Sequence, residues 1–232
     1  YWRAPLILLV GVFNSIACYS HWRAVAISHS KTALFIPATS VLSVILAVFL
    51  LGEARVVSIK SWIGVCLLLF STFVLASSKS KRDKKLNAEF FTWVAIMTLL
   101  FSSVTVFMKY SASVIAVSRW SFSFQYYLGS AFGALMIFVL SKHNERGGKL
   151  GIRGWKDTLP LALSIYVSHI LIYWSLELAP LSIIEPLFRV TGLIFPFLIG
   201  QLYFDEKSDF TKRDWVGCLI AFIGVIFIVI NN

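Results

Sequence analysis

Two groups of polar side chains interrupt otherwise apolar stretches in the second half of the chain. His169 lies near the middle of one stretch, flanked by Tyr166 and Tyr173. If it faces a cavity, this histidine would bind a small solute or carry a proton, because an imidazole gains and loses a proton near neutral pH. The alternative is a histidine that packs between helices with its hydrogen bonds satisfied.

Glu185 and Arg189 form the second group. They are four positions apart, so on a helix they share one face. Facing a cavity, the pair would hold a zwitterion such as an amino acid. Two alternatives stay open: a pair that satisfies itself, or an Arg189 side chain that extends to a membrane interface. Asn14 and Ser103 would hydrogen-bond a solute, or would equally join neighbouring helices.

These residues lie in a chain whose composition argues against a soluble domain. Of its 232 residues, 58% are hydrophobic and only 14% are charged. The charges cluster between apolar runs that are long enough to cross a bilayer as helices. We expect an all-α membrane protein with eight spans present: Ala4–Ile27, Thr32–Gly52, Ser61–Ser78, Phe90–Tyr110, Trp120–Ser141, Thr158–Leu178, Ser182–Phe204 and Trp215–Ile230.

An internal repeat organises these spans. Residues 32–75 align with residues 185–228 without a gap, and both copies contain a long span, an acidic end, a polar turn, Trp-x-Gly and a second span. Glu53 and Glu206 occupy matching positions where the following helix begins, and helix N-termini favour a carboxylate there. We interpret both as structural. Four further residues are assigned to close helix packing or to kinks: Gly64, Gly217, Pro37 and Pro196.

The two copies differ in length. Residues 1–78 hold three spans, residues 79–89 form a basic linker, and residues 90–232 hold five spans. We therefore predict that two helices precede Tyr1 in the natural protein. The complete protein would have ten helices in two inverted five-helix repeats, a common design of secondary transporters.

At these positions the sequence resembles a known family. The stretch Ile36-Pro37 to Leu51-Gly52-Glu53, followed by Trp62-Ile63-Gly64, resembles the fourth and fifth helices of EamA-type transporters, which belong to the drug/metabolite transporter superfamily. Leu181 to Glu206, followed by Trp215-Val216-Gly217, resembles the matching helices of the second repeat. In span order the resemblance covers essentially the whole chain.

The resemblance implies a multi-pass transporter of the cell (inner) membrane. It would move small solutes such as amino acids, metabolites or drugs, usually as an exporter, through a central cavity that opens alternately to either side. The expected partners are the small-molecule cargo and membrane lipids, and a homodimer is a further option. Two alternatives stay open: an organophosphate or nucleotide-sugar exchanger of the same superfamily, and a membrane receptor or scaffold that does not transport.

The basic residues bear on orientation and on partners. The net charge is +10, and most Lys and Arg lie in loops on one face of the predicted bundle. This pattern makes that face cytoplasmic and the C-terminus external. EamA-type transporters usually have both termini in the cytoplasm, which conflicts with this orientation. Either this chain is inverted relative to the family, or one span is miscounted, or the positive-inside rule does not hold for it. We favour the orientation that the positive-inside rule gives. Because the basic residues flank spans, we expect no nucleic acid.

Enzyme motifs are absent from the sequence. HExxH, GxSxG and paired intramembrane aspartates do not occur, and the cysteines stand apart inside apolar runs. We therefore expect no enzyme activity, no metal and no cofactor. An organophosphate exchanger needs several cations deep in its cavity, and Arg189 is the one clear candidate.

Overall fold

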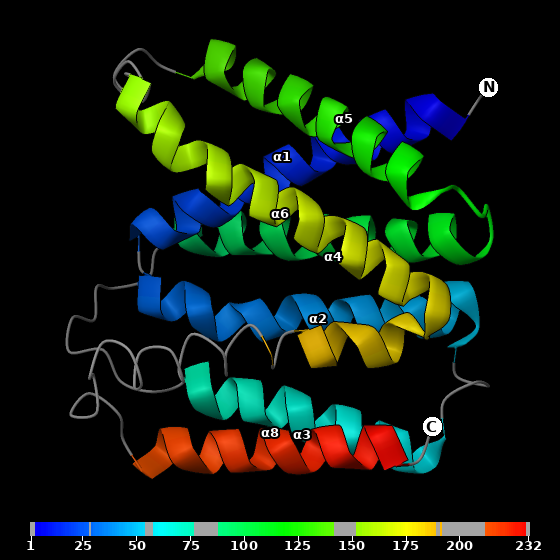
Figure 1. Cartoon of the computed structure of the whole chain (residues 1–232). Helices are drawn as coiled ribbons and strands as arrows, with labels where there is room; N and C mark the ends of the chain where they lie inside the picture. Colours follow the sequence, from blue (N-terminus) through cyan, green and yellow to red (C-terminus); the bar gives the residue numbers. More distant parts are fainter. Residues whose placement is uncertain are drawn as a thin grey trace. The chain divides into compact units, whose positions relative to one another are not determined.

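The computed structural model describes residues 3–27, 29–53, 58–76, 88–141, 152–188, 191 and 212–230. Within these ranges every regular element is helical and no strand occurs, so the all-α prediction is confirmed for this part of the chain. A further helical segment covers residues 181–188. The helices with defined bounds are α1 (Arg3–Ile27), α2 (His29–Leu51), α3 (Ile59–Ala76), α4 (Ala88–Ser113), α5 (Arg119–Leu140), α6 (Ile152–Leu178) and α8 (Lys212–Ile230) (Figure 1).

Most helices begin and end within a few residues of the predicted spans. Helix α6 differs most, because it begins at Ile152, in the segment expected to be a loop, and holds Pro160 inside. Pro160 is the ninth residue of α6, beyond the first turn, so it removes one hydrogen bond from inside the helix. The predicted span from Ser182 to Phe204 is described only at 182–188 and 191, so its full length stays a prediction.

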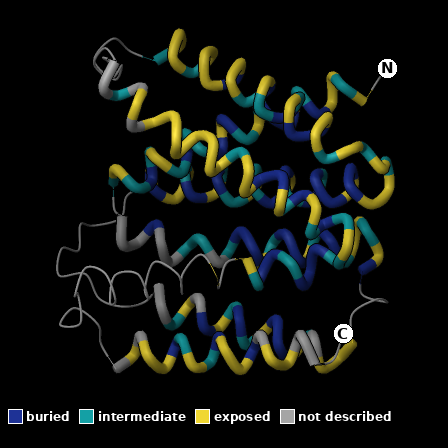
Figure 2. Tube along the Cα trace, viewed as in Figure 1, coloured by how far each residue is buried: buried dark blue, intermediate teal, exposed yellow. Residues whose placement is uncertain are grey.

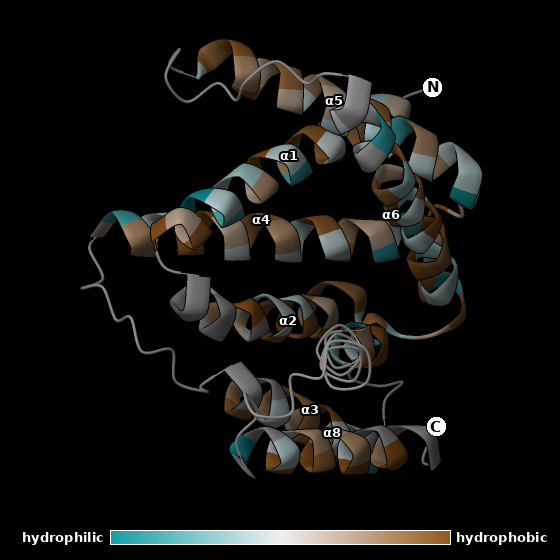
Figure 3. Cartoon of the chain, turned by 60° about the vertical axis from the view of Figure 1, so that its left-hand side comes forward, coloured by the Kyte–Doolittle hydropathy of each residue, from teal (hydrophilic) through white to brown (hydrophobic). Residues whose placement is uncertain are grey.

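Within the described residues, four helices are long and apolar enough to cross a membrane: Arg3–Ile27, Ala88–Ser113, Arg119–Leu140 and Thr158–Leu178. The shortest of them has 21 residues, or about 30 Å of helix, which matches the hydrocarbon core. Their outer faces carry exposed apolar side chains. On α5, Phe124, Leu128 and Phe132 follow one another at helical spacing on the exposed side, as Figures 2 and 3 show for the helix as a whole. Lipid covers such a surface in a membrane protein.

The chain forms two compact units. Unit 1 consists of Tyr1–Tyr19 and Phe107–Leu178, and unit 2 consists of Ser20–Val106 and Ala179–Asn232. Helices α1 and α4 contribute to both. These boundaries do not coincide with the predicted repeat boundary at residues 79–89, and the repeat and the ten-helix count stay predictions.

Unit 2 contains an antiparallel pair, α3 and α8, which lie side by side (Figure 1). Gly64 and Gly217 are buried at this contact. The Gly217 carbonyl accepts a hydrogen bond of 2.8 Å from Ser71 Oγ, and a Cβ on Gly224 would lie 3.1 Å from the Gly64 carbonyl oxygen. Small residues let two helix backbones approach closely. Beside this contact lies an apolar cluster of Val65, Leu68, Ile183 and Ala221.

Unit 1 is built around a close crossing of α1 and α5. A Cβ on Gly11 would collide with the Tyr126 carbonyl oxygen, and a Cβ on Gly129 would collide with the Leu8 carbonyl oxygen. Gly133, one turn further along α5, faces Ser15. The backbones meet here because neither helix presents a side chain at the crossing point. The crossing therefore fixes the part of α5 that carries the aromatic residues described next.

Candidate functional site

An aromatic cluster surrounds His169 in unit 1. The imidazole stacks on the ring of Tyr126, with centroids 4.5 Å apart and planes inclined by 19°. The ring of Phe122 is nearly parallel to the imidazole at 6.2 Å, and the ring of Tyr127 meets it edge-on at 5.1 Å. Offset stacked and edge-to-face pairs of this kind are favourable contacts. They hold the imidazole in one orientation.

Helical spacing on α5 and α6 assembles this cluster. On α6, Tyr166, His169 and Tyr173 follow at intervals of three and four residues, so they share one face. On α5, Phe122 and Tyr126 are four residues apart. Sequence reasoning identified the three α6 residues but missed the α5 aromatic residues. Their spacing was the available signal, although spacing alone does not show which helix they face.

The two flanking tyrosines are held in place differently. Tyr173 is buried, stacks on Phe122 at 4.5 Å, and donates a hydrogen bond of 2.9 Å from its hydroxyl to the Val117 carbonyl oxygen. Tyr166 is half-buried and contacts the ring of Tyr127 at 5.4 Å. The structure therefore brings all three predicted α6 residues into one cluster. The Tyr173 hydroxyl already has a hydrogen-bond partner, Val117, which lies in the turn between α4 and α5. Tyr173 therefore anchors the cluster to that turn.

One polar atom of the cluster lacks a partner. His169 is 7% exposed, and its Nε2 atom makes no hydrogen bond within the described residues. A buried polar atom without a partner destabilises a fold by about 1–3 kcal/mol. Native structures satisfy the great majority of such atoms, so each exception requires an explanation such as a ligand. The histidine thus differs from a packing residue whose hydrogen bonds are complete.

His169 lines an open pocket of about 300 Å³ between α5 and α6. The other lining residues are Tyr127, Ser164, Ile165, Ser168 and Ile172. A second pocket of about 490 Å³ lies between α1 and α5, and Tyr127 lines it too. Its polar lining comes from Asn14, Ser15, Cys18, Tyr19 and Ser130. Both volumes lie in or near the range of small-molecule pockets.

Asn14 belongs to a hydrogen-bond network in the second pocket. Its Nδ2 atom donates to Ser130 Oγ at 3.5 Å, and Ser130 Oγ donates to the Gly11 carbonyl oxygen at 3.0 Å. Ser15 Oγ donates to the Ser130 carbonyl oxygen at 2.6 Å. The network joins α1 to α5, as the helix-joining interpretation of Asn14 predicted. Because the same atoms line the pocket, the solute-binding interpretation stays open as well.

Ser103 lies apart from both pockets. It is exposed on α4, and its hydroxyl donates a hydrogen bond of 2.8 Å to the Leu99 carbonyl oxygen of its own helix. The preceding residue, Ser102, is buried, and its hydroxyl donates a hydrogen bond to the Thr39 carbonyl oxygen on α2, within unit 2. The structure therefore does not bring Ser103 together with His169 or Asn14.

The described part of unit 2 contains two buried carboxylates, Glu53 and Glu185. Glu53 is 5% exposed and accepts three hydrogen bonds of 2.7–2.8 Å, from the backbone amides of Leu181 and Ser182 and from Ser182 Oγ. It therefore lies at the N-terminus of the segment 181–188, whereas the sequence suggested the helix that follows Glu53 directly. Amide groups and the helix dipole stabilise a negative charge at this position. The contact spans 128 residues in sequence.

Glu185 is the second buried carboxylate, and it accepts a hydrogen bond of 3.2 Å from Ser40 Oγ on α2. Ser40 belongs to a row of buried hydroxyls that includes Thr39 and Ser43. The predicted partner Arg189 lies outside the described residues, as do Pro196 and Glu206; for Pro37 only the helical backbone is described. The zwitterion site at Glu185 and Arg189 stays a prediction.

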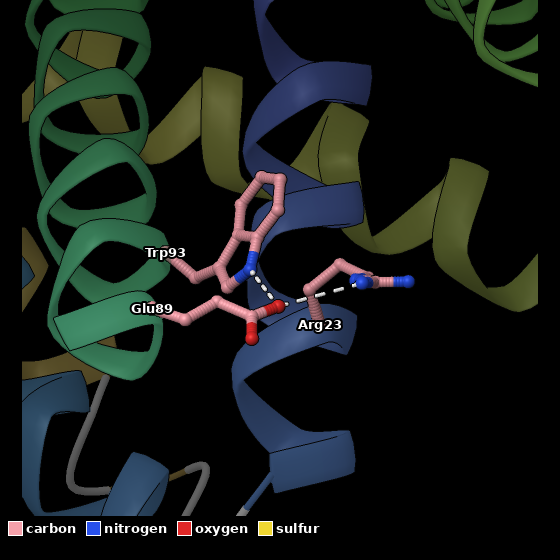
Figure 4. A network of polar contacts seen from close by, with 3 residues as sticks. All are labelled: Arg23, Glu89 and Trp93. Atoms are coloured by element: carbon pink, nitrogen blue, oxygen red, sulfur yellow. Dashed lines mark hydrogen bonds and ion pairs between the residues drawn. The ribbon is translucent and has the colours of Figure 1, made fainter. Parts of the chain in front are cut away.

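Two charged residues near helix ends, Lys109 and Arg23, have specific partners. Lys109 is buried, and its Nζ atom donates to the Leu176 carbonyl oxygen at 2.7 Å, in the last turn of α6. Figure 4 shows that Arg23 and Trp93 both reach the carboxylate of Glu89, at 3.5 Å and 3.2 Å. Cations favour helix C-termini, and arginine and tryptophan favour membrane interfaces.

Comparison with models of known protein families and with curated protein sequences gives no match to this chain. The resemblance to EamA-type transporters therefore stays a prediction. Among the residues that the structure describes, no three His, Cys, Asp or Glu side chains come close enough to hold a metal ion. The chemistry available in the His169 and Asn14 pockets of unit 1 is hydrogen bonding and ring stacking from uncharged side chains.

Proposed function

We propose that this chain is an integral membrane transporter that binds a small solute in the His169 pocket of unit 1. The observation that carries the proposal is the unpartnered Nε2 atom of His169, which is buried in a stacked aromatic cluster beside an open pocket. The cluster lies on two helices that are long and apolar enough to cross a membrane. Polar groups at membrane depth mark solute or ion pathways.

The neighbouring residues prepare the imidazole for binding. Stacking on Tyr126 and edge contact with Tyr127 restrict rotation of the ring, so a solute that bonds to Nε2 does not have to immobilise it. Ser164 and Ser168 stand on the same pocket wall. A solute with a polar group and a flat apolar part would satisfy Nε2 and still contact the rings.

Transport requires that such a site opens alternately to either side of the membrane. The EamA resemblance supports this mode of action and favours export. The composition also supports a membrane transporter, because this sequence consists mainly of apolar helical runs and contains no polar stretch long enough for a separate soluble domain. An organophosphate exchanger fits less well, because no described Lys or Arg lines the His169 pocket or the Asn14 pocket.

Flux measurements on the reconstituted chain test the proposal. Proteoliposomes would be loaded with radiolabelled nucleosides, amino acids and sugars, one at a time, and efflux would be compared for the parent, His169→Ala and His21→Ala. The matched control His21 carries an imidazole with a contact of its own, at 3.1 Å from the Met97 sulfur in unit 2. We expect efflux of at least one solute, lost in His169→Ala and kept in His21→Ala.

Two results would contradict the proposal. Efflux that survives His169→Ala would keep transport but move the binding site away from unit 1. Folded protein that passes no solute at all would favour a receptor or scaffold. Size-exclusion profiles of each variant would first establish that the proteins compared are folded.

A further inference from the structure

We infer that the His169 pocket and the Asn14 pocket of unit 1 are the halves of one binding chamber for an uncharged, ring-bearing solute, and that Tyr127 is the side chain that divides them. The inference rests on the proposed function for the claim that the bound molecule is cargo. Independently of transport, it assigns a binding chamber, a class of solute and a residue, Tyr127, that limits the size of the solute.

Tyr127 is the residue that the two pockets share. It lines the pocket of about 300 Å³ with Ser168 and His169, and it lines the pocket of about 490 Å³ with Asn14 and Cys18. One aromatic ring therefore borders both spaces. Shortening this side chain would join them without moving a helix.

The contacts of Tyr127 leave its position adjustable. Its hydroxyl donates to the Ile165 carbonyl oxygen at 3.5 Å, which is the long limit of a hydrogen bond. Its ring makes edge-on or tilted contacts with Tyr126, Tyr166 and His169 rather than parallel stacks. By contrast, the Tyr173 hydroxyl is held at 2.9 Å and its ring is stacked. Of these two tyrosines, Tyr127 is the one that can yield to a larger solute.

The lining determines the class of solute. Among the residues that the structure describes, neither pocket is lined by Asp, Glu, Lys or Arg, so an ion bound there would lose its hydration without gaining an opposite charge. An uncharged solute avoids this penalty. Hydrogen-bonding side chains line both pockets: His169 and Ser168 in one, and Asn14 with Ser130 in the other. The aromatic rings between them favour a flat ring in the solute.

Cysteine protection tests the chamber without any flux. Cys18 lies in the larger pocket, and Cys66→Ser with Cys218→Ser leaves it as the single thiol. Ser168→Cys with Cys18→Ser on that background places the single thiol in the smaller pocket instead. The purified proteins would react with N-ethylmaleimide in the presence of benzamide, benzoate or benzamidine. These three probes share one ring and differ in charge.

We expect benzamide to slow labelling at one or both positions, and benzoate and benzamidine to have no effect at the same concentration. Tyr127→Ala should lower the half-protecting concentration of the longer amide 4-phenylbenzamide by about tenfold relative to benzamide, because its second ring then fits into the joined space. The control Tyr110→Ala removes an exposed tyrosine of α4 that lines neither pocket, and should leave the ratio unchanged. Tyr127→Val provides a second variant if the alanine protein does not fold.

The outcomes separate this inference from the proposed function. Equal protection by benzoate or benzamidine would overturn the solute class. An unchanged ratio in a folded Tyr127→Ala or Tyr127→Val protein would overturn the role of Tyr127, and no protection by benzamide at either position would overturn the chamber. Protection without flux in proteoliposomes would leave the binding chamber and remove transport, whereas flux without protection would do the reverse.

Discussion

In unit 2 the carboxylate of Glu53 accepts three hydrogen bonds from the start of the segment 181–188, whereas in unit 1 the Nε2 atom of His169 accepts or donates none within the described residues. Both groups are at least nine-tenths buried. Burial therefore does not distinguish a structural polar residue from a binding residue. What distinguishes them is whether the surrounding protein already provides every partner, since a satisfied group has nothing left to offer a solute.

The largest expected effect is at Glu53. Replacement by alanine removes the acceptor of three donors and leaves buried amides unpaired, so Glu53→Ala should lower the free energy of unfolding by about 3 kcal/mol. Equilibrium unfolding in mixed detergent and SDS micelles measures this quantity. Glu53→Gln, which keeps one amide oxygen as an acceptor, should fall between the parent and the alanine variant. A Glu53→Ala protein of parental stability would show that the contact is not structural, and the comparison with His169 would fail.

The next effect concerns the α1–α5 crossing, which positions the aromatic cluster of α5. Gly129→Ala places a Cβ against the Leu8 backbone, which has no free rotation, and should lower the free energy of unfolding by about 2 kcal/mol. The matched substitution Gly224→Ala meets chiefly the Leu68 side chain, at 2.8 Å, which can turn aside. The same unfolding assay should therefore give a smaller loss for Gly224→Ala. Equal losses would show that the backbone contact does not govern packing in unit 1.

His169→Phe tests the contrast between His169 and Glu53, because the free energy of unfolding should rise while solute binding and efflux should be lost. Phenylalanine keeps the ring contacts with Tyr126 and removes the unpartnered nitrogen, so the free energy of unfolding should rise by about 1 kcal/mol. Solute efflux and benzamide protection should be lost in the same protein. A fall in stability would indicate that His169 has a partner in the folded protein and belongs with Glu53 among the structural residues.

The smallest effect is expected at the network of Glu89, Arg23 and Trp93. Glu89 is 52% exposed, and surface ion pairs contribute little because water screens them. Glu89→Gln should change the free energy of unfolding by about 0.5 kcal/mol or less. Glu89→Gln is a control for the removal of one negative charge. A large change in its free energy of unfolding would weaken the conclusion that Glu53→Ala destabilises the protein through its three lost hydrogen bonds.

The sequence predicted the helices better than it predicted their contacts. Apolar runs bounded by charges placed α1, α4 and α5 within a few residues, because the bounds of such helices follow from local composition. It also grouped Tyr166, His169 and Tyr173, since residues three and four apart share a helix face. The sequence did not predict the contacts of Tyr126 and Tyr127, because the spacing of residues on one helix face does not identify the helix that packs against that face.

Glu53 illustrates the same limit. Its type and position indicated a carboxylate at a helix N-terminus, and such a contact exists, but with a segment 128 residues away rather than with the next helix in the chain. Local sequence contains the preference of a carboxylate for free amides. It does not contain the folding that brings one particular set of amides within 2.7 Å.

The sequence by itself therefore determined that the described part of the chain is helical and apolar, where most of its described helices begin and end to within a few residues, and that a histidine interrupts one of them. Only the tertiary structure decided that Glu53 is satisfied, that His169 Nε2 is not, and that Tyr127 borders two pockets. The physical reason is range: helix formation depends on hydrogen bonds four residues apart, whereas the satisfaction of a buried polar atom depends on every segment that packs around it.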